Sequence, residues 1–149
     1  MVTISDDRLM IWDMPTGSLR SECIDSFQVR GGVQSVALHP RDPFLVVGCK
    51  LGDIILMHLH PGNFNIVSTN VLDVKHTNRV VSIAFHQTAP VFAAISTDAL
   101  NLWKLSDDYL SATCVANIAQ NNRGTYSFSV EFDASTLYTK IGTNYQVWR

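Results

Sequence analysis

Long apolar runs are missing from this chain of 149 residues. The longest, Ile54–Met57 and Val91–Ile95, are four and five residues long, whereas a membrane-spanning helix needs about twenty. The first residues, Met1–Asp7, also lack the basic stretch and apolar core of a secretory signal. We therefore expect no membrane partner and a cytoplasmic or otherwise intracellular location.

Cysteine and charge are also sparse. The three cysteines, Cys23, Cys49 and Cys114, are far apart and odd in number, which favours reduced thiols over a disulfide framework. Charged residues make up 16% and the net charge is -2, so no overall basic field exists to attract nucleic acid. Hydrophobic residues reach 46%, too many for a disordered chain, and the length suits one domain.

Short strand patterns fill the chain instead. Segments such as Phe44–Val47 and Tyr145–Trp148 are rich in branched or aromatic residues, and Gly, Pro, Asp or Asn residues bound such segments. No segment keeps a helical period over three turns. The sequence predicts an all-β fold.

One strand pattern occurs three times. Val33–Pro40 reads VQSVALHP, Val80–Gln87 reads VVSIAFHQ and Ser127–Asp133 reads SFSVEFD. Each copy begins 47 residues after the previous one. A spacing of this size indicates a repeat architecture, in which each unit is one supersecondary element.

A second strand pattern recurs with nearly the same period. Its four copies end in a bulky residue, and these residues are spaced by 45, 46 and 45 positions: Trp12, Met57, Trp103 and Trp148. Five residues after the first three of them come turn-forming residues, Gly17, Gly62 and Asp108. Two independent strands with one period make a chance match improbable.

These residues resemble the WD-repeat family, whose unit is four antiparallel strands in about 40 to 45 residues, with Gly-His near the start and Trp-Asp near the end. Trp12–Asp13 is a literal match, whereas Trp103 and Trp148 keep only the aromatic residue. Lys75–His76 supplies the histidine of the third repeat.

The resemblance implies a partial WD-repeat β-propeller of about twelve antiparallel strands in three to four incomplete blades. We expect one partial propeller domain over residues 1–149, with repeat segments of roughly 1–26, 27–73, 74–119 and 120–149. In family order the chain begins at the second strand of one blade and ends at the third strand of another. We therefore expect an arc, since known propellers need at least four complete blades to close a ring.

The family also implies a hydrogen-bonded chain that locks each blade. It joins a His before the first strand, a Ser or Thr on the second, an Asp in the next turn and a Trp on the third. In the third repeat, these positions hold His76, Ser96, Asp98 and Trp103. The first repeat keeps only Ser5, Asp7 and Trp12, and the second has Cys49, Leu51 and Met57, for which we expect apolar packing.

Several histidines suggest chemistry, but structural explanations fit them better. His58 and His60 share one face of a strand, yet no third ligand has a matching spacing. His39 and His86 occupy the same place in two repeats, which favours a shared turn role over a catalytic pair. We predict no metal site from them.

Three other arrangements also lack the context that their chemistry needs. Ser96, His76 and Asp98 have the composition of an acyl-transfer triad, but no strained nucleophile elbow surrounds Ser96. Gly31–Gly32 has no lysine or helix after it, which excludes a phosphate loop. The acidic pairs Asp6–Asp7 and Asp107–Asp108 lie in predicted turns, where Asp is favoured. We predict no catalytic or cofactor-binding residue.

The function that follows is a non-catalytic scaffold for protein–protein interaction. The segment Leu137–Thr143 is also similar to the degenerate propellers of fungal NACHT-type signalling ATPases, which implies a sensing role. One alternative is a truncated fragment of a longer WD-repeat signalling protein with no independent role. Another is a propeller hydrolase, for which the innermost strands offer only Glu131 as a carboxylate.

Loop charges suggest where a partner binds. In family order, one face of the propeller carries Asp6, Asp7 and Asp98 but also five basic residues, Arg30, Lys50, Lys75, Arg79 and Arg123. The other face carries one basic residue, Arg41, and mainly acidic ones, Asp13, Asp42, Asp107, Asp108 and Asp133. We predict that Arg30, Lys75, Arg79 and Arg123 bind an acidic segment of a partner protein, and that open blade edges favour self-association.

Overall fold

The computed structural model describes residues 1–13, 22–120, 128–134 and 136–148, and within them it contains fourteen β-strands and no helix. Accordingly, no helix in the described ranges could cross a membrane. The strands are β1 (Val2–Ser5), β2 (Arg8–Asp13), β3 (Glu22–Gln28), β4 (Val33–Leu38), β5 (Phe44–Cys49), β6 (Ile54–Leu59), β7 (Ile66–Val71), β8 (Ser82–Phe85), β9 (Val91–Ile95), β10 (Ala99–Leu105), β11 (Ala112–Ala119), β12 (Phe128–Asp133), β13 (Thr136–Ile141) and β14 (Asn144–Trp148).

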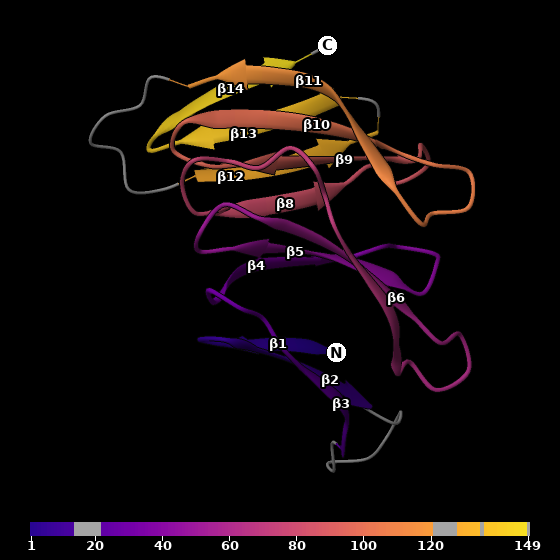
Figure 1. Cartoon of the computed structure of the whole chain (residues 1–149). Helices are drawn as coiled ribbons and strands as arrows, with labels where there is room; N and C mark the ends of the chain where they lie inside the picture. The colour runs from indigo at the N-terminus through magenta and orange to yellow at the C-terminus, as the bar shows by residue number, and fades with distance from the viewer. Residues whose placement is uncertain (14–21, 121–127, 135, 149) are drawn as a thin grey trace.

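These strands form four antiparallel sheets, each a simple meander: β1-β2-β3, β4-β5-β6-β7, β8-β9-β10-β11 and β12-β13-β14. The sheets follow one another in chain order (Figure 1). The all-β fold of successive incomplete blades is therefore confirmed. The four sheets have three, four, four and three strands, so the described residues contain fourteen strands where about twelve were expected.

The first sheet ends close to the approximate boundary expected at residue 26. The third strand of the first sheet, β3, continues to Gln28. The chain reverses only at Gly31 and Gly32, whose φ angles of 87° and 84° lie in the left-handed region that favours glycine.

Both strand patterns have a structural counterpart. The three copies with the 47-residue spacing become the innermost strands β4, β8 and β12 of their sheets. These strands lie next to one another, β4 beside β8 and β8 beside β12, and β1 lies beside β4. The pattern that ends in Trp or Met becomes β2, β6, β10 and β14. The period therefore reflects one repeated sheet.

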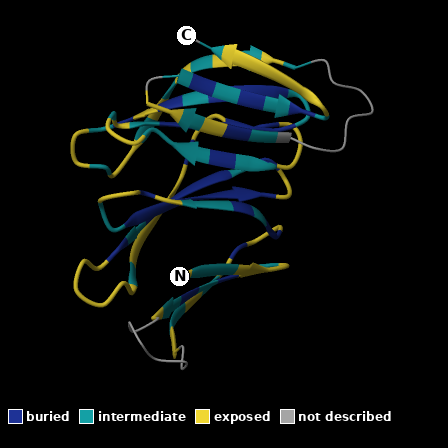
Figure 2. Cartoon of the chain, turned by 180° about the vertical axis from the view of Figure 1, so that it is seen from behind, coloured by how far each residue is buried: buried dark blue, intermediate teal, exposed yellow. Residues whose placement is uncertain are grey.

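The hydrophobic core is divided among the contacts between neighbouring sheets. Leu9, Leu45 and Met57 belong to a cluster that joins the first and second sheets. Phe44, Phe92 and Trp103 belong to a second cluster, between the second and third sheets, and a third cluster follows it. The buried residues accordingly concentrate on the middle strands of the two four-stranded sheets, β5, β6, β9 and β10 (Figure 2). A single sheet this small cannot bury its faces alone, so each depends on its neighbours.

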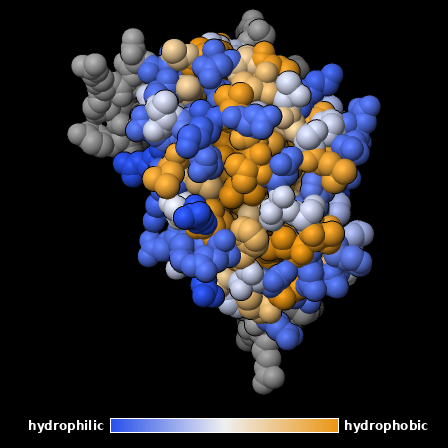
Figure 3. All heavy atoms as spheres, viewed as in Figure 1, coloured by the Kyte–Doolittle hydropathy of each residue, from blue (hydrophilic) through white to orange (hydrophobic). Residues whose placement is uncertain are grey.

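Apolar side chains also reach the surface. They gather in the middle of the face shown in Figure 3, with hydrophilic residues around them. The strands β7 and β11, which end the two complete sheets, carry the exposed residues Val67, Val71 and Val115.

Serine residues of the inner strands connect neighbouring sheets. Ser35 Oγ in β4 donates a hydrogen bond of 2.7 Å to the carbonyl oxygen of Val80. The equivalent Ser82 in β8 accepts one of 3.2 Å from the amide of Val130 in β12. The repeated serine in the sequence pattern is thus a contact between blades.

Candidate functional site

The loops expected on one face of the propeller do lie together. We call this surface, formed by residues 6–7, 29–32, 50–53, 72–81 and 96–98, the upper loop face. Backbone amides link its loops: Val33 donates to Asp6, Lys50 to Gly32 and His76 to Gly52. Side chains on these loops therefore project from a fixed frame.

Three of the four residues of the expected lock are joined by hydrogen bonds. Ser96 Oγ donates to Asp98 Oδ1 over 2.5 Å, and His76 Nδ1 lies 2.7 Å from Ser96 Oγ. Because the serine proton points to Asp98, His76 must carry its own proton on Nδ1 and donate it. His76 and Ser96 are buried, with exposed fractions of 1% and 0%.

Thr77 completes this network, although sequence reasoning did not identify it. Its backbone amide donates to Asp98 Oδ2 over 3.1 Å, and its hydroxyl donates to the same oxygen. Burial by itself would raise the pKa of Asp98, but the hydrogen bonds from Ser96 and Thr77 lower it to about 2. Burial lowers the pKa of His76 against the opposing effect of Asp98. The network therefore holds a carboxylate and a neutral imidazole.

Trp103 is not joined to the network. Its indole Nε1 is buried and has no hydrogen-bond partner within the described residues. In the first and fourth sheets, by contrast, Trp12 Nε1 donates to Thr3 Oγ1 over 2.7 Å and Trp148 Nε1 donates to Thr139 Oγ1 over 3.0 Å. Each threonine stands nine residues before its tryptophan, a signal that was available in the sequence.

The same geometry argues against an acyl-transfer triad. In such a triad, the histidine lies between the serine and the carboxylate. Here Ser96 is hydrogen-bonded directly to both His76 and Asp98. Its side chain is fully buried, so its hydroxyl cannot reach a substrate.

The first and second sheets do not repeat the hydrogen-bonded network of the third sheet at the lock positions. Asp7 is half-buried and accepts a hydrogen bond of 2.8 Å from Gln28, and Ser5 is exposed. Cys49 and Met57 pack in the core as expected. Leu51 does not, because 61% of its surface is exposed. Cys49 and Met57 therefore contribute to the expected apolar packing of the second blade, whereas the Leu51 side chain lies at the surface.

The basic residues of the upper loop face differ in their partners. Lys50 pairs with Asp6 at 3.0 Å and Lys75 with Asp53 at 3.5 Å. Arg30 and Arg79 are exposed, and within the described ranges neither has an ion-pair partner. Arg123 lies outside the described residues. Asp53 and Asp73 belong to the same loops, so this face is less basic than expected.

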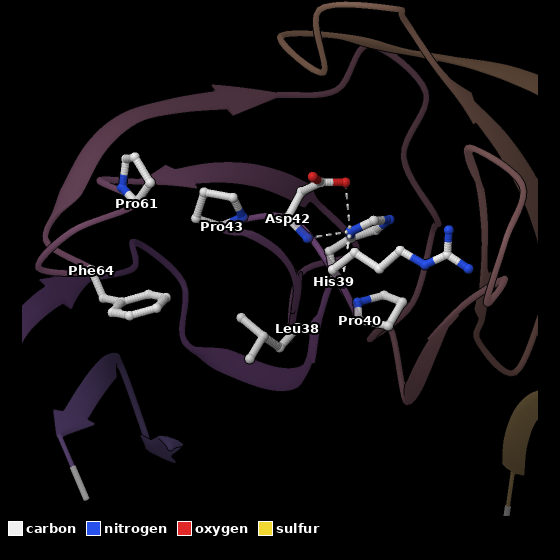
Figure 4. A pocket seen from close by; sticks show the side chains of 8 residues that line it. Leu38, His39, Pro40, Asp42, Pro43, Pro61 and Phe64 are labelled. Atoms are coloured by element: carbon white, nitrogen blue, oxygen red, sulfur yellow. Dashed lines mark hydrogen bonds and ion pairs between the residues drawn. The ribbon is translucent and has the colours of Figure 1, made fainter. Parts of the chain in front are cut away.

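The opposite face contains a pocket of about 350 Å³ between the β4–β5 and β6–β7 loops, lined by Leu38, His39, Pro40, Arg41, Asp42, Pro43, Pro61 and Phe64 (Figure 4). His39 Nδ1 accepts a hydrogen bond of 3.0 Å from the amide of Asp42 and a longer one from Arg41. The ring is therefore neutral, and its contact of 3.2 Å with the Asp42 carboxylate becomes an ion pair only on protonation. Burial lowers the pKa of His39, Asp42 raises it and Arg41 lowers it.

Three other histidines also have structural roles. His86 Nδ1 accepts hydrogen bonds from the amides of Thr88 and Ala89, so it shapes its turn as His39 does. His60 Nδ1 accepts one of 3.1 Å from Gly62. His58 lies on β6 with its ring 5.9 Å from that of Phe44.

Carboxylates do not converge on the inner strands. Besides Glu131, β12 contains Asp133 at its end, and both side chains are exposed. Two carboxylates two residues apart on one strand do not reach a common substrate from opposite sides, as a glycosidase requires.

Comparison with known proteins identifies the fold alone. No family model and no curated protein matches the chain. A search of solved structures finds the structure of U3-55K, a WD40 β-propeller protein, with a TM-score of 0.68 and 15% sequence identity. The match covers 96% of this chain and 45% of that one, so this chain spans less than half the length of the matched chain. The chain thus has the fold of a partial β-propeller.

Proposed function

We propose that this chain is a non-catalytic scaffold of the WD-repeat type, which binds an acidic segment of an intracellular protein through its upper loop face. The proposal rests on the exposure of Arg30 and Arg79 and on their lack of an ion-pair partner in the described residues. Both are exposed on loops that backbone hydrogen bonds hold in place, and neither has an ion-pair partner in the described parts of the chain. Guanidinium groups in this state suit bidentate binding of carboxylates.

The lack of a competing chemistry supports the same conclusion. Ser96 is buried in a structural network, and the residues that line the His39 pocket include no Ser, Thr, Cys or Lys as a nucleophile. The core is divided among the contacts between sheets, and the loops project from this packed frame, an arrangement that is typical of repeat proteins that bind other proteins. The resemblance to propellers of NACHT-type proteins would make that partner a signalling component.

Charge reversal tests this function once a partner has been isolated by affinity capture. Arg79→Glu and Arg123→Glu should slow association about tenfold or more at low salt, and the effect should shrink as salt is added. Asp107→Lys and Asp108→Lys on the opposite face serve as controls and should leave the rate unchanged. Loss of binding with the control variants alone would refute the assignment of the upper loop face.

A further inference from the structure

The second sheet has apolar residues at every lock position. They stand 47, 47, 47 and 46 residues before the corresponding residues of the third sheet: Val29 for His76, Cys49 for Ser96, Leu51 for Asp98 and Met57 for Trp103. Val29, Cys49 and Met57 are buried, with exposed fractions of 1%, 0% and 0%. The polar network of the third sheet therefore has an apolar counterpart.

A cavity of about 440 Å³ opens beside this apolar counterpart, between β3 of the first sheet and β6 and β7 of the second. Its apolar lining consists of Phe27, Val29, Cys49, Leu51, Ile55 and Val71. Burial and the nearby Asp53 raise the pKa of Cys49 to about 11, so its thiol stays neutral. The volume lies within the range of about 300 to 1,000 Å³ that is common for ligand pockets.

The two strands that flank the cavity are joined by a hydrogen bond outside its lining. Asp25 Oδ2 in β3 accepts this bond of 2.8 Å from the amide of Ile66 in β7. Leu51 and Val71 line the cavity with exposed fractions of 61% and 58%. Exposed apolar residues next to an apolar cavity indicate a surface that a partner covers.

Arg30 also lines the cavity, and its position in the repeat is informative. It stands 47 residues before Thr77, which donates two hydrogen bonds to the Asp98 carboxylate. In the second sheet, the place of that carboxylate is taken by Leu51. Asp53, the acidic residue of the lining, already pairs with Lys75 at 3.5 Å. Arg30 is thus a donor whose acceptor is missing from the second sheet.

We propose that a partner protein supplies this acceptor. An acidic side chain binds the Arg30 guanidinium where Asp98 stands in the third sheet, and the apolar residue next to it in the partner sequence fills the cavity. This inference rests on the proposed scaffold function, which it makes specific by naming the chemistry of the bound segment.

Short peptides test the site directly. The probe is Ac-Gly-Leu-Asp-Gly-NH2, titrated into the full ¹⁵N-labelled chain and followed by amide chemical shifts. It should cause saturable shifts confined to residues 27–30, 49–55 and 69–71. Peptides with Asn for Asp, or with Ala for Leu, should bind at least about fivefold more weakly, because each lacks one of the two contacts.

Three variants identify the contributing residues. Arg30→Gln should weaken binding of the Leu-Asp peptide about tenfold and remove the preference for Asp over Asn. Arg41→Gln, which changes an exposed arginine of the opposite face, should leave the affinity unchanged. Leu51→Asp installs the carboxylate that the third sheet carries, so it should occupy Arg30 internally and abolish peptide binding while the chain stays folded.

The inference is overturned if no shift occurs up to about 10 mM peptide, a limit that excludes even weak association. It is also overturned if Arg30→Gln keeps the preference for Asp, or if Arg41→Gln weakens binding of the Leu-Asp peptide as much as Arg30→Gln does. If the peptide fails while partner association still depends on Arg79, the cavity assignment falls and the scaffold function stands. If substitutions on the upper loop face do not change the association with the partner, the proposed function itself is refuted, whether or not the peptide binds.

Discussion

Trp103 in β10 lies diagonally across from Ala94 in β9, since Trp103 pairs directly with Phe92 and Ala94 is two residues further along the strand. The same diagonal relates Trp148 to Thr139, because Trp148 pairs with Leu137. Diagonal neighbours on one face of a sheet are close enough for long side chains to touch. A threonine there binds the indole, whereas an alanine offers no acceptor.

This relationship predicts the effect of Ala94→Ser. The new hydroxyl should accept the unpartnered Trp103 N–H, so the free energy of unfolding should stay within about 0.5 kcal/mol of the wild type or rise. Ala93→Ser is the matched control, because Ala93 is equally buried on the same strand. It should lose about 1 to 3 kcal/mol. Equal losses in urea unfolding would contradict the assigned geometry.

The network around Asp98 predicts a second difference. Asp98→Ala leaves Ser96 and Thr77 without their acceptor and should cost about 1 to 3 kcal/mol. Asp7→Ala, at the equivalent position of the first sheet, removes an exposed contact with Gln28 and should cost less. Urea midpoints measure both variants. Equal shifts would show that the two positions contribute alike.

Acid should destabilise the chain in a defined pH window. His39 and His76 both have a pKa below 6.5 in the folded state, chiefly because of burial, whereas an unfolded histidine titrates near about 6.5. The unfolded chain then binds more protons between the two values, so the histidines' contribution to stability is complete above about 6.5 and declines as the pH falls toward their folded pKa. Stability measured from about pH 7 to 5 should therefore decrease.

His76→Gln should flatten this pH dependence, and the exposed His60→Gln should not. An unchanged slope with His76→Gln would exclude His76 as a source. Asp98 affects stability in a separate pH window, because its pKa is about 2 in the folded chain and its ordinary value is 3.8. Its contribution to the stability of the fold is present above pH 3.8 and is lost as the pH falls through about 2.

The open edge of the fourth sheet predicts self-association of the isolated chain. The strand β14 has no neighbour on its outer side within the described residues, and it exposes Tyr145 and Val147 by 68% and 51%. Val147→Lys should reduce association, because charge on an edge strand opposes pairing. Leu110→Lys, in the loop between β10 and β11, is the matched control, because Leu110 is 55% exposed but lies on no edge strand. Sedimentation velocity that shows a monomer at all concentrations of the wild type would exclude this contact.

The sequence by itself determined the strands and their succession. Alternating apolar residues specify a strand, and turn-forming residues specify its ends, within a few residues of the chain. The recurrence of this local pattern every 47 residues was therefore enough to place β4, β8 and β12. The turn role of His39 and His86 was also predictable, since each histidine binds amides two or three residues away.

Only the tertiary structure decided which polar groups meet across the sheets. The bonds of Thr77 to Asp98 and of Lys50 to Asp6 join residues 21 and 44 positions apart. Whether such groups meet depends on how distant segments of the chain pack together, which no local pattern encodes. For the same reason, a literal match to the lock positions could not reveal that Trp103 is left out, or that Leu51 lies exposed beside a cavity.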